Sequence, residues 1–317
     1  MTTPSNRSSS MPQKKASFKR YLEYALFAGL ISLIKHSPPR ARRLEKKALV
    51  FFLKNGSRRH SRLISHNLAM AFPSDDPYLL AGLKTKIYDH FGSIFMEIAA
   101  TFARRDPRAI LARTRVNNLQ IIVQALQKNR GVIIFSAHFG NWEWIPLILH
   151  TRLGKDIHSI ARPMDNVLIE KKVKEFREAM GSRIIYKQGS LRTILKRLGA
   201  NEIVYLLIDQ NTMPREGVFV DFFAQKATAI TTVAQLYLKK NIPVVPVFLH
   251  YEGQEIILDV LPEIEYPAAS QDPAALTDLT QQLTWLIEAQ IKKFPEQWFW
   301  FHNRWKTKPQ GEACESQ

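Results

Sequence analysis

The residues best suited to chemistry lie in the segment SAHFGNWEW, residues 136–144. An apolar run typical of a buried strand precedes it, at 131–137, and an apolar helix follows. On one continuous helix His138 and Glu143 would point about 140° apart, so they can meet only across a strand-to-helix turn, where Gly140 permits the bend. A carboxylate bonded to one imidazole nitrogen leaves the other free to accept a proton. The spacing therefore predicts a general-base pair in which Glu143 orients His138.

Two other interpretations of this pair stay open. His138 can be a core histidine beside a glutamate that merely starts a helix. It can also be a zinc ligand, but no neighbouring set of His, Cys or Glu stands at ligand spacing, so we expect no metal site. The only cysteine, Cys314, lies in a polar tail and cannot form an internal disulfide, which suits the cytosol.

The pattern around this segment predicts the elements that must position it. Short apolar runs typical of strands recur at 131–137, 157–163, 202–209, 217–223, 242–251 and 255–261. Amphipathic segments typical of helices lie between and after them, at 141–151, 166–180, 190–198, 228–240 and 274–293. This alternation predicts an α/β fold with a mixed, largely parallel sheet flanked by helices. Ligands in such folds bind where the strands end.

The N-terminal section is helical in pattern and strongly basic. The chain carries a formal net charge of +17, and residues 1–60 hold fourteen Lys and Arg against two acids. Residues 1–17 lack acids and any apolar period, which predicts a disordered basic arm. Residues 18–36 are predicted to form a membrane-anchor helix, because their apolar core is flanked by basic residues. We therefore expect an anionic membrane surface as the partner, and no nucleic acid.

The manner of membrane contact stays open. The apolar part of the helix covers roughly 20 Å against a hydrocarbon core of ~30 Å. A tilted span, a re-entrant anchor and an interfacial helix all remain possible. A secretory signal is the alternative, but no small-residue cleavage site follows and the sequence downstream is densely basic.

Three further segments carry polar groups at expected strand ends or among aromatic residues. ARPMDN (161–166) offers Arg162, which could clamp a phosphate or steady an oxyanion, or pair with Asp165. In IDQN (208–211), Asp209 and Gln210 could orient Arg162 or a substrate hydroxyl, or form a plain turn. WFWFHNRWKTKP (298–309) alternates aromatic and polar groups. It suits a membrane interface, with Arg304 and Lys306 as candidate contacts to lipid phosphate, or a last strand packed into the core.

Taken in order, these segments resemble the bacterial lipid A biosynthesis (late) acyltransferases, a family of the lysophospholipid acyltransferase superfamily. The blocks that carry the resemblance are NLAMAFP (67–73), FMEIA (95–99), HFGNWE (138–143), ARPMDN, IDQN, GVFVDFF (217–223) and the aromatic-basic ending. The resemblance covers about residues 20 to 309. It implies a glycerolipid acyltransferase-like domain at 37–309, with 310–317 as a disordered tail.

The resemblance also implies an activity. An acyl carrier protein thioester would donate a fatty acyl group to a hydroxyl on a 3-hydroxyacyl chain of a lipid A precursor. His138 would be the general base oriented by Glu143, without a metal or organic cofactor. The residues expected to bind substrate are Arg162, Asp165, Asn166, Asp209, Gln210, Arg304 and Lys306. The enzyme would work at the cytoplasmic face of a bacterial inner membrane.

The chain departs from the family pattern at Ala224, Lys226, Thr232 and Asn303, where the family usually has glycine, proline, glycine and arginine. These positions keep a different acceptor open, either another membrane glycolipid or an aminolipid, and coenzyme A as the carrier. A third possibility, from a different class, is a non-enzymatic basic protein that binds membranes.

Overall fold

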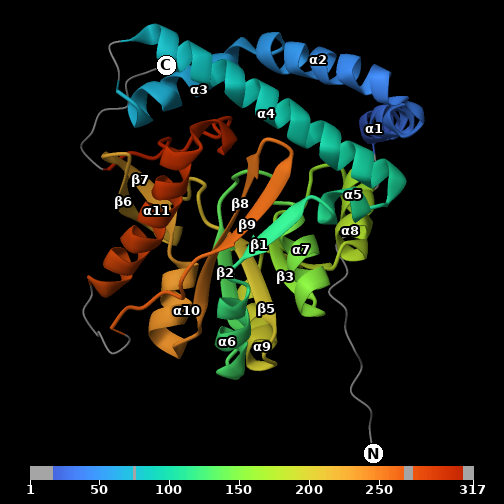
Figure 1. Ribbon diagram of the computed structural model, residues 1–317. Coiled ribbons are helices and arrows are strands. Elements are labelled where there is room, and N and C mark those ends of the chain that lie inside the picture. Colours follow the sequence, from blue (N-terminus) through green and yellow to red (C-terminus); the bar gives the residue numbers. More distant parts are fainter. Residues whose placement is uncertain (1–16, 74–75, 268–273, 310–317) are drawn as a thin grey trace, which may run out of the picture.

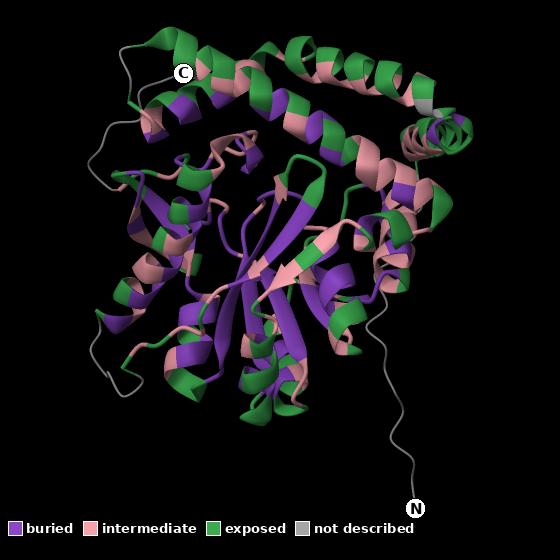
Figure 2. Ribbon diagram, viewed as in Figure 1, coloured by how far each residue is buried: buried purple, intermediate pink, exposed green. Residues whose placement is uncertain are grey.

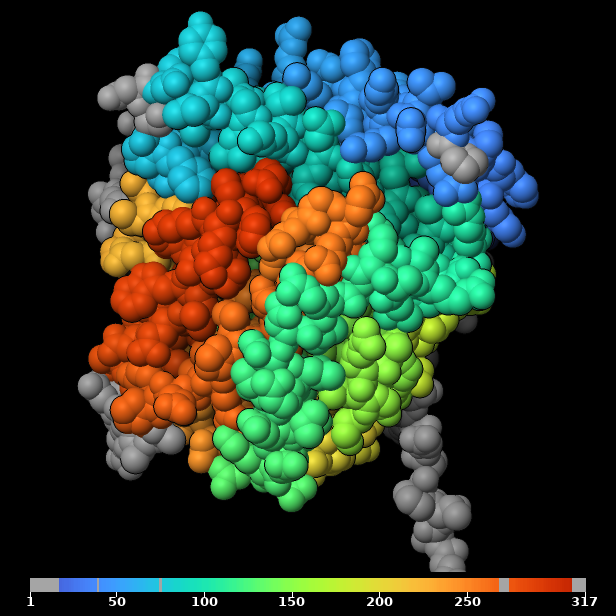
Figure 3. All heavy atoms as spheres, in the orientation of Figure 1, coloured from blue at the N-terminus to red at the C-terminus, as the bar shows by residue number. Residues whose placement is uncertain are grey.

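The computed structural model describes residues 17–73, 76–267 and 274–309. Helices from the N-terminal section lie across one end of an α/β body (Figure 1). They are α1 (Phe18–His36), α2 (Pro39–Asn55), α3 (Arg58–Ala71) and α4 (Pro77–Arg104). Gly56 is the C-cap of α2. Figure 3 shows the surface that these helices form along the top of the molecule.

The body is built on a seven-stranded sheet with the order β1-β9-β8-β2-β5-β3-β4. Every neighbouring pair is parallel except β8 and β9, which confirms the mixed, largely parallel sheet. The strands are β1 (Thr114–Asn117), β2 (Val132–Ser136), β3 (Ile157–Ala161), β4 (Ser182–Tyr186), β5 (Ile203–Leu207), β8 (Val244–Glu252) and β9 (Glu255–Val260).

The central strand β2 is fully buried (Figure 2). Its side chains divide between the two faces of the sheet. Ile133 and Phe135 belong to one hydrophobic cluster, while Val132 and Ile134 belong to the other. This division follows from the two-residue repeat of a strand. A parallel strand covered on both faces has no polar face, which explains why its sequence reads as one continuous apolar run.

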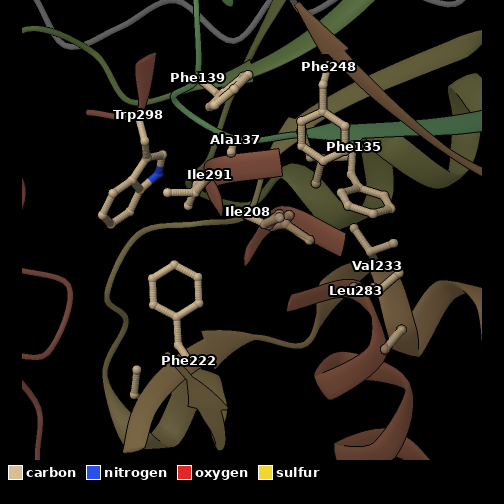
Figure 4. Packing of buried hydrophobic residues seen from close by; sticks show 14 of the residues in the cluster. Phe135, Ala137, Phe139, Ile208, Phe222, Val233, Phe248, Leu283, Ile291 and Trp298 are labelled. Atoms are coloured by element: carbon tan, nitrogen blue, oxygen red, sulfur yellow. The ribbon is translucent and has the colours of Figure 1, made fainter. Parts of the chain in front are cut away.

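Two sets of helices supply these clusters. On the Phe135 face pack α3, α4, α9 (Ser190–Gly199), α10 (Thr232–Lys240) and α11 (Ala275–Lys293). On the Ile134 face pack α6 (Gln120–Gln127), α7 (Trp144–Leu153) and α8 (Val167–Ala179), with the short α5 (Arg108–Leu111) nearby. Figure 4 shows the Phe135 face, where rings from β2, β8 and the C-terminal segment pack against aliphatic side chains of α10 and α11.

A two-stranded hairpin stands apart from the main sheet. It consists of β6 (Gly217–Phe222) and β7 (Gln225–Ile230), and a 3-10 turn, η1 (Pro214–Glu216), leads into it. The sequence reading assigned the residues of β7 partly to a helix at 228–240, and it missed β1 and β4. The aromatic ending, which follows η2 (Pro295–Gln297), forms turns and one isolated bridge between Phe139 and Trp298 instead of a last strand.

Helix α1 covers the segment 18–36 expected as a membrane anchor. Among the residues described, none of the helices combines the length and apolar character that a membrane crossing requires. A spanning anchor is therefore not supported. One side of α1 packs on the body, where Phe27 meets the Phe102 ring and Ile34 is buried. The arm predicted to be disordered at 1–17 lies outside the described residues except for Ser17, the N-cap of α1, and the tail at 310–317 lies wholly outside them.

Candidate active site

The turn after β2 places His138 at the carboxyl edge of the sheet. Gly140 has a φ of +54°, and a Cβ there would lie 1.9 Å from the Leu249 carbonyl oxygen, so only glycine fits the bend. The C-terminal segment fixes the turn from one side. Gly140 N–H donates to the Gln297 carbonyl at 2.8 Å, and Phe299 N–H donates to the His138 carbonyl at 2.9 Å.

His138 pairs with Asp209, the residue that follows β5 by two positions. The imidazole Nδ1 lies 2.8 Å from Asp209 Oδ1, and the His138 backbone N–H donates to Oδ2 at 2.9 Å. β2 and β5 are parallel neighbours with Ser136 opposite Leu207. Residues two positions beyond each strand end therefore meet.

The environment keeps Asp209 ionised. Burial acts to raise the pKa of this carboxyl, but the charge and hydrogen bonds of His138, with the Trp298 indole N–H, outweigh it and hold the pKa at about 2. An ionised Asp209 accepts the proton of Nδ1, which leaves Nε2 as the proton acceptor. Gln210 Nε2 lies 3.3 Å from that nitrogen. Asp209 thus holds the imidazole of His138 in one orientation.

The prediction that Glu143 orients His138 is wrong, because Glu143 pairs with a different residue. Its carboxylate binds the Arg177 guanidinium, with Nε donating to Oε2 at 2.8 Å and a second contact through Nη2. The residues between His138 and Glu143 form a bend and turn, and α7 begins only at Trp144. This geometry directs Glu143 toward α8 instead of back to the imidazole. The Glu143 charge raises the pKa of Arg177.

The residues expected after β3 have separate roles. Arg162 is exposed and lines the same cavity as His138. Asp165 is exposed and is not among the residues that line this cavity. Asn166 is buried and caps α8, accepting from the backbone N–H of Leu168 at 3.0 Å. Its amide also donates to α1, at the Arg20 carbonyl and Glu23. The structure therefore gives Asn166 a structural role in place of the expected contact with substrate.

Arg304 and Lys306, the two cations expected to contact lipid phosphate, differ in their exposure to solvent. Arg304 is 1% exposed, donates to the Thr228 carbonyl and lies over the Phe222 ring at 5.1 Å. Burial lowers its pKa to about 10. It cannot reach a lipid head group from this position, so that expectation is wrong. Lys306 is exposed and remains a candidate.

Glu97 on α4 is a site residue that the sequence reading missed. Its carboxylate accepts from Trp144 Nε1 at 2.8 Å and from Asn141 Nδ2 at 3.2 Å. The Tyr251 hydroxyl and the Arg113 guanidinium donate to it as well. Glu97 thus ties the N-terminal helices to the turn that carries His138. Glu97 is the glutamate of the FMEIA block, so that block contained the signal.

A cavity of about 730 Å³ extends from His138 into the body. Its wall combines buried apolar side chains, such as Leu206 and Leu236, with seven charged ones besides His138, including Arg162 and Arg177. Cavities of ~300–1,000 Å³ with a mostly apolar lining and few polar groups are typical ligand sites. The His138–Asp209 dyad stands at the polar end of this one.

A buried carboxylate–histidine dyad beside a largely apolar cavity suits an enzyme that activates a hydroxyl next to a hydrocarbon chain, as an acyltransferase does. A family model described as bacterial lipid A biosynthesis acyltransferase matches residues 11–307. The chain belongs to this family.

Curated relatives agree with this assignment. Over 264 residues the chain is 26% identical to the lipid A biosynthesis lauroyltransferase of Escherichia coli, covering 80% of this chain and 81% of the relative. It is 23% identical to the lipid A biosynthesis myristoyltransferase of the same organism, over 98% of this chain and 96% of the relative. It is also 26% identical to the phosphatidylinositol mannoside acyltransferase of Mycolicibacterium smegmatis, over 57% of this chain and 59% of the relative.

Proposed function

We propose that this enzyme transfers a fatty acyl group from an acyl carrier protein thioester to the hydroxyl of a 3-hydroxyacyl chain on a lipid A precursor. The observation that carries the proposal is the His138–Asp209 dyad at the rim of the cavity. Family membership supports the transferase class, and two relatives named as lipid A acyltransferases, matched over most of their length, support the acceptor.

His138 acts as the general base in this mechanism. Nε2 takes the proton of the acceptor hydroxyl while that oxygen attacks the thioester carbonyl. Asp209 stabilises the imidazolium that forms, because its carboxylate already accepts the Nδ1 proton. The tetrahedral intermediate then collapses, the C–S bond breaks, and the imidazolium returns its proton to the departing sulfur. Protons balance over the cycle, and no group on the enzyme is acylated.

Gln210 and Arg162 are the candidates for the developing oxyanion. The Gln210 amide already lies 3.3 Å from His138 Nε2, close to where the carbonyl must stand. Arg162 lines the cavity as an exposed cation. A preorganised donor beside the oxyanion contributes about 10²–10³ in rate, and a cation there can also bind a substrate phosphate.

We place the enzyme at the cytoplasmic face of a bacterial inner membrane, held at the surface by α1 and α2. The exposed apolar stripe on α1 follows helical spacing, and α2 adds more apolar side chains. The members of this surface are Phe18, Leu22, Leu26, Leu30, Leu33, Leu44, Phe51 and Phe52. Basic residues flank both helices, as in helices that lie in an anionic interface.

Vesicles containing anionic phospholipid test this surface. Replacing both Leu26 and Leu30 by glutamate should weaken binding at least about tenfold, since each buried leucine contributes roughly 1.5–3 kcal/mol. Val123→Glu, which changes an exposed apolar residue on α6, is the control. Equal vesicle binding by the wild type, the double variant and Val123→Glu would disprove the role of this surface in membrane binding.

Another glycolipid acceptor is the second candidate, favoured by the similarity to a phosphatidylinositol mannoside acyltransferase. Of the positions that depart from the family pattern, Thr232 lines the cavity. Lys226 instead pairs with Asp221 across the β6–β7 hairpin at 2.8 Å. Thr232 is thus the departure best placed to alter the acceptor.

The deciding assay offers purified enzyme a panel of acyl carrier protein and coenzyme A thioesters with a tetra-acylated lipid A precursor. We expect transfer from the carrier protein and a loss of at least ~100-fold for His138→Ala. Wild-type enzyme that hydrolyses thioester without acylating this lipid would point to another glycolipid. Equal rates for wild type and His138→Ala would rule out the mechanism.

A further inference from the structure

Strands β3 and β5 are paired over only part of their length. The register joins Ile157 to Ile203 and Ser159 to Tyr205 and ends there. β3 continues to Ala161 beside β4, while β5 continues to Leu207 beside β2. Strands β3 and β5 therefore separate toward the carboxyl edge of the sheet, where His138 stands.

The cavity occupies this separation. Ile160 of β3 and Leu206 of β5 line it, and so do the next residues on both strands, Ala161 and Leu207. Leu206 belongs to the hydrophobic cluster on one face of the sheet, and Leu207 packs against the cluster on the other. One cavity thus reaches both faces through the gap, with the dyad at the shared end.

The arm on the α7–α8 side is enclosed. Trp144, Phe176, Met180 and Tyr205 line it, and all four are buried. Its polar groups are paired with one another. Ser182 donates to the Ser159 hydroxyl at 2.7 Å, and Glu143 holds Arg177 as described. Because paired polar groups demand no partner from a ligand, this arm suits a hydrocarbon chain of limited length.

The arm on the α9–α10 side is open at its outer end. Ile194 and Leu236 form a buried apolar floor. Leu195 on α9 is exposed, and so are Lys239 and Lys240 at the end of α10. A chain lying on this floor can continue to the surface, so this arm sets no fixed length.

We propose that the cavity holds two hydrocarbon chains at once, one on each face of the sheet. The donor acyl chain occupies the α7–α8 arm, and the hydrocarbon of the acceptor occupies the α9–α10 arm. This inference rests on the proposed function, in which both substrates bring a chain to one new ester bond. The enclosed arm selects donor length because it ends, whereas the open arm tolerates different acceptors. The gap between β3 and β5 lets the chains diverge from His138.

Binding of laurate, counted by native mass spectrometry, tests the two arms without any acceptor. The wild-type protein should bind two equivalents. Met180→Trp fills the enclosed arm and Leu195→Trp narrows the open arm, so each variant should bind one equivalent of laurate. Leu238→Trp adds the same ring on α10 at a position that does not line the cavity, and it should still bind two. Met180→Phe and Leu236→Phe are milder alternatives should a tryptophan variant fail to fold.

Kinetics then assign the arms. Met180→Trp should shift the ratio of kcat/KM for long over short acyl donors by at least ~10-fold toward the short ones. Leu195→Trp should leave that ratio unchanged and raise the KM of the acceptor. A single laurate on the wild type, or a shifted donor ratio in Leu195→Trp alone, would overturn the proposal. Two bound laurates without transfer to a lipid A precursor would support the cavity and refute the acceptor named above.

Discussion

The indole N–H of Trp298 donates to Asp209 Oδ2 at 2.8 Å, and both side chains are buried. The aromatic C-terminal segment is therefore part of the catalytic site. Trp298 also packs edge-on against Trp300 at 4.7 Å, which fixes the indole. The carboxylate that orients His138 is thus held by residues from two distant parts of the chain.

Replacing Asp209 should cost far more activity than replacing Glu143. In Asp209→Asn the amide can donate to the imidazole and favour the wrong tautomer, so we expect kcat to fall by about 10²–10⁴. Glu143→Gln keeps the dyad and weakens the Arg177 pair, with an expected loss of about tenfold or less. Steady-state measurement of kcat for both variants shows which carboxylate orients His138. A larger loss in Glu143→Gln would return the orienting role to Glu143.

Acid should remove a stabilising contribution from Asp209. Its folded pKa of about 2 lies below the ordinary value of 3.8, so the contribution is present above about pH 4 and is lost as the pH falls through 2. Urea unfolding from pH 6 down to 2.5 should show a steeper fall in the free energy of unfolding for wild type than for Asp209→Asn. Parallel curves would mean that another carboxyl governs the acid transition.

Glu97→Gln should disturb the turn that carries His138. All four partners of Glu97 donate hydrogen bonds, so an amide NH₂ in its place faces a donor. We expect the free energy of unfolding to fall by about 1–3 kcal/mol and kcat to fall about tenfold with the KM of the donor unchanged. Glu97→Asp, which keeps the charge, should recover part of kcat. An unchanged kcat in a destabilised Glu97→Gln protein would limit Glu97 to a structural role.

Ala224→Gly should stabilise the protein. Ala224 closes the β6–β7 hairpin with a φ of +58°, a conformation that costs a non-glycine residue roughly 1 kcal/mol. Thermal unfolding should therefore shift upward by a few degrees. The control is Ala227→Gly in the same hairpin, where a fully buried methyl group is lost and the shift should be downward. A lower melting temperature for Ala224→Gly would show that the turn is not strained.

The fold class and His138 could be predicted because they depend on local patterns. Apolar runs such as GVIIFSA mark the buried strands, and Gly140 marks the bend. Strands β1 and β7 could not be predicted from the sequence, because TRVN and QKATAI contain few apolar residues. They form through pairing with β9 and β6, which a local pattern does not reveal.

The partner of His138 could not be found in the same way. Glu143 is the carboxylate nearest to His138 in the sequence, whereas Asp209 lies 71 residues after His138. His138 and Asp209 meet only because β5 is the neighbour of β2 and because the register of this pair places Ser136 opposite Leu207. Arg304 was misassigned for a related reason. Its charge suggested the surface, but the aromatic segment buries it against Phe222.

The link between Asn166 and α1 has a practical consequence for anyone who shortens the protein to improve its handling. A chain begun after His36 would retain His138, Asp209 and every cavity side chain. It would nevertheless deprive the Asn166 amide of both its acceptors, at the Arg20 carbonyl and Glu23, and uncover the Phe102 ring. The loop with Arg162 would then lose its support, so low activity in such a protein would reflect a loosened loop as well as the loss of the exposed apolar side chains of α1.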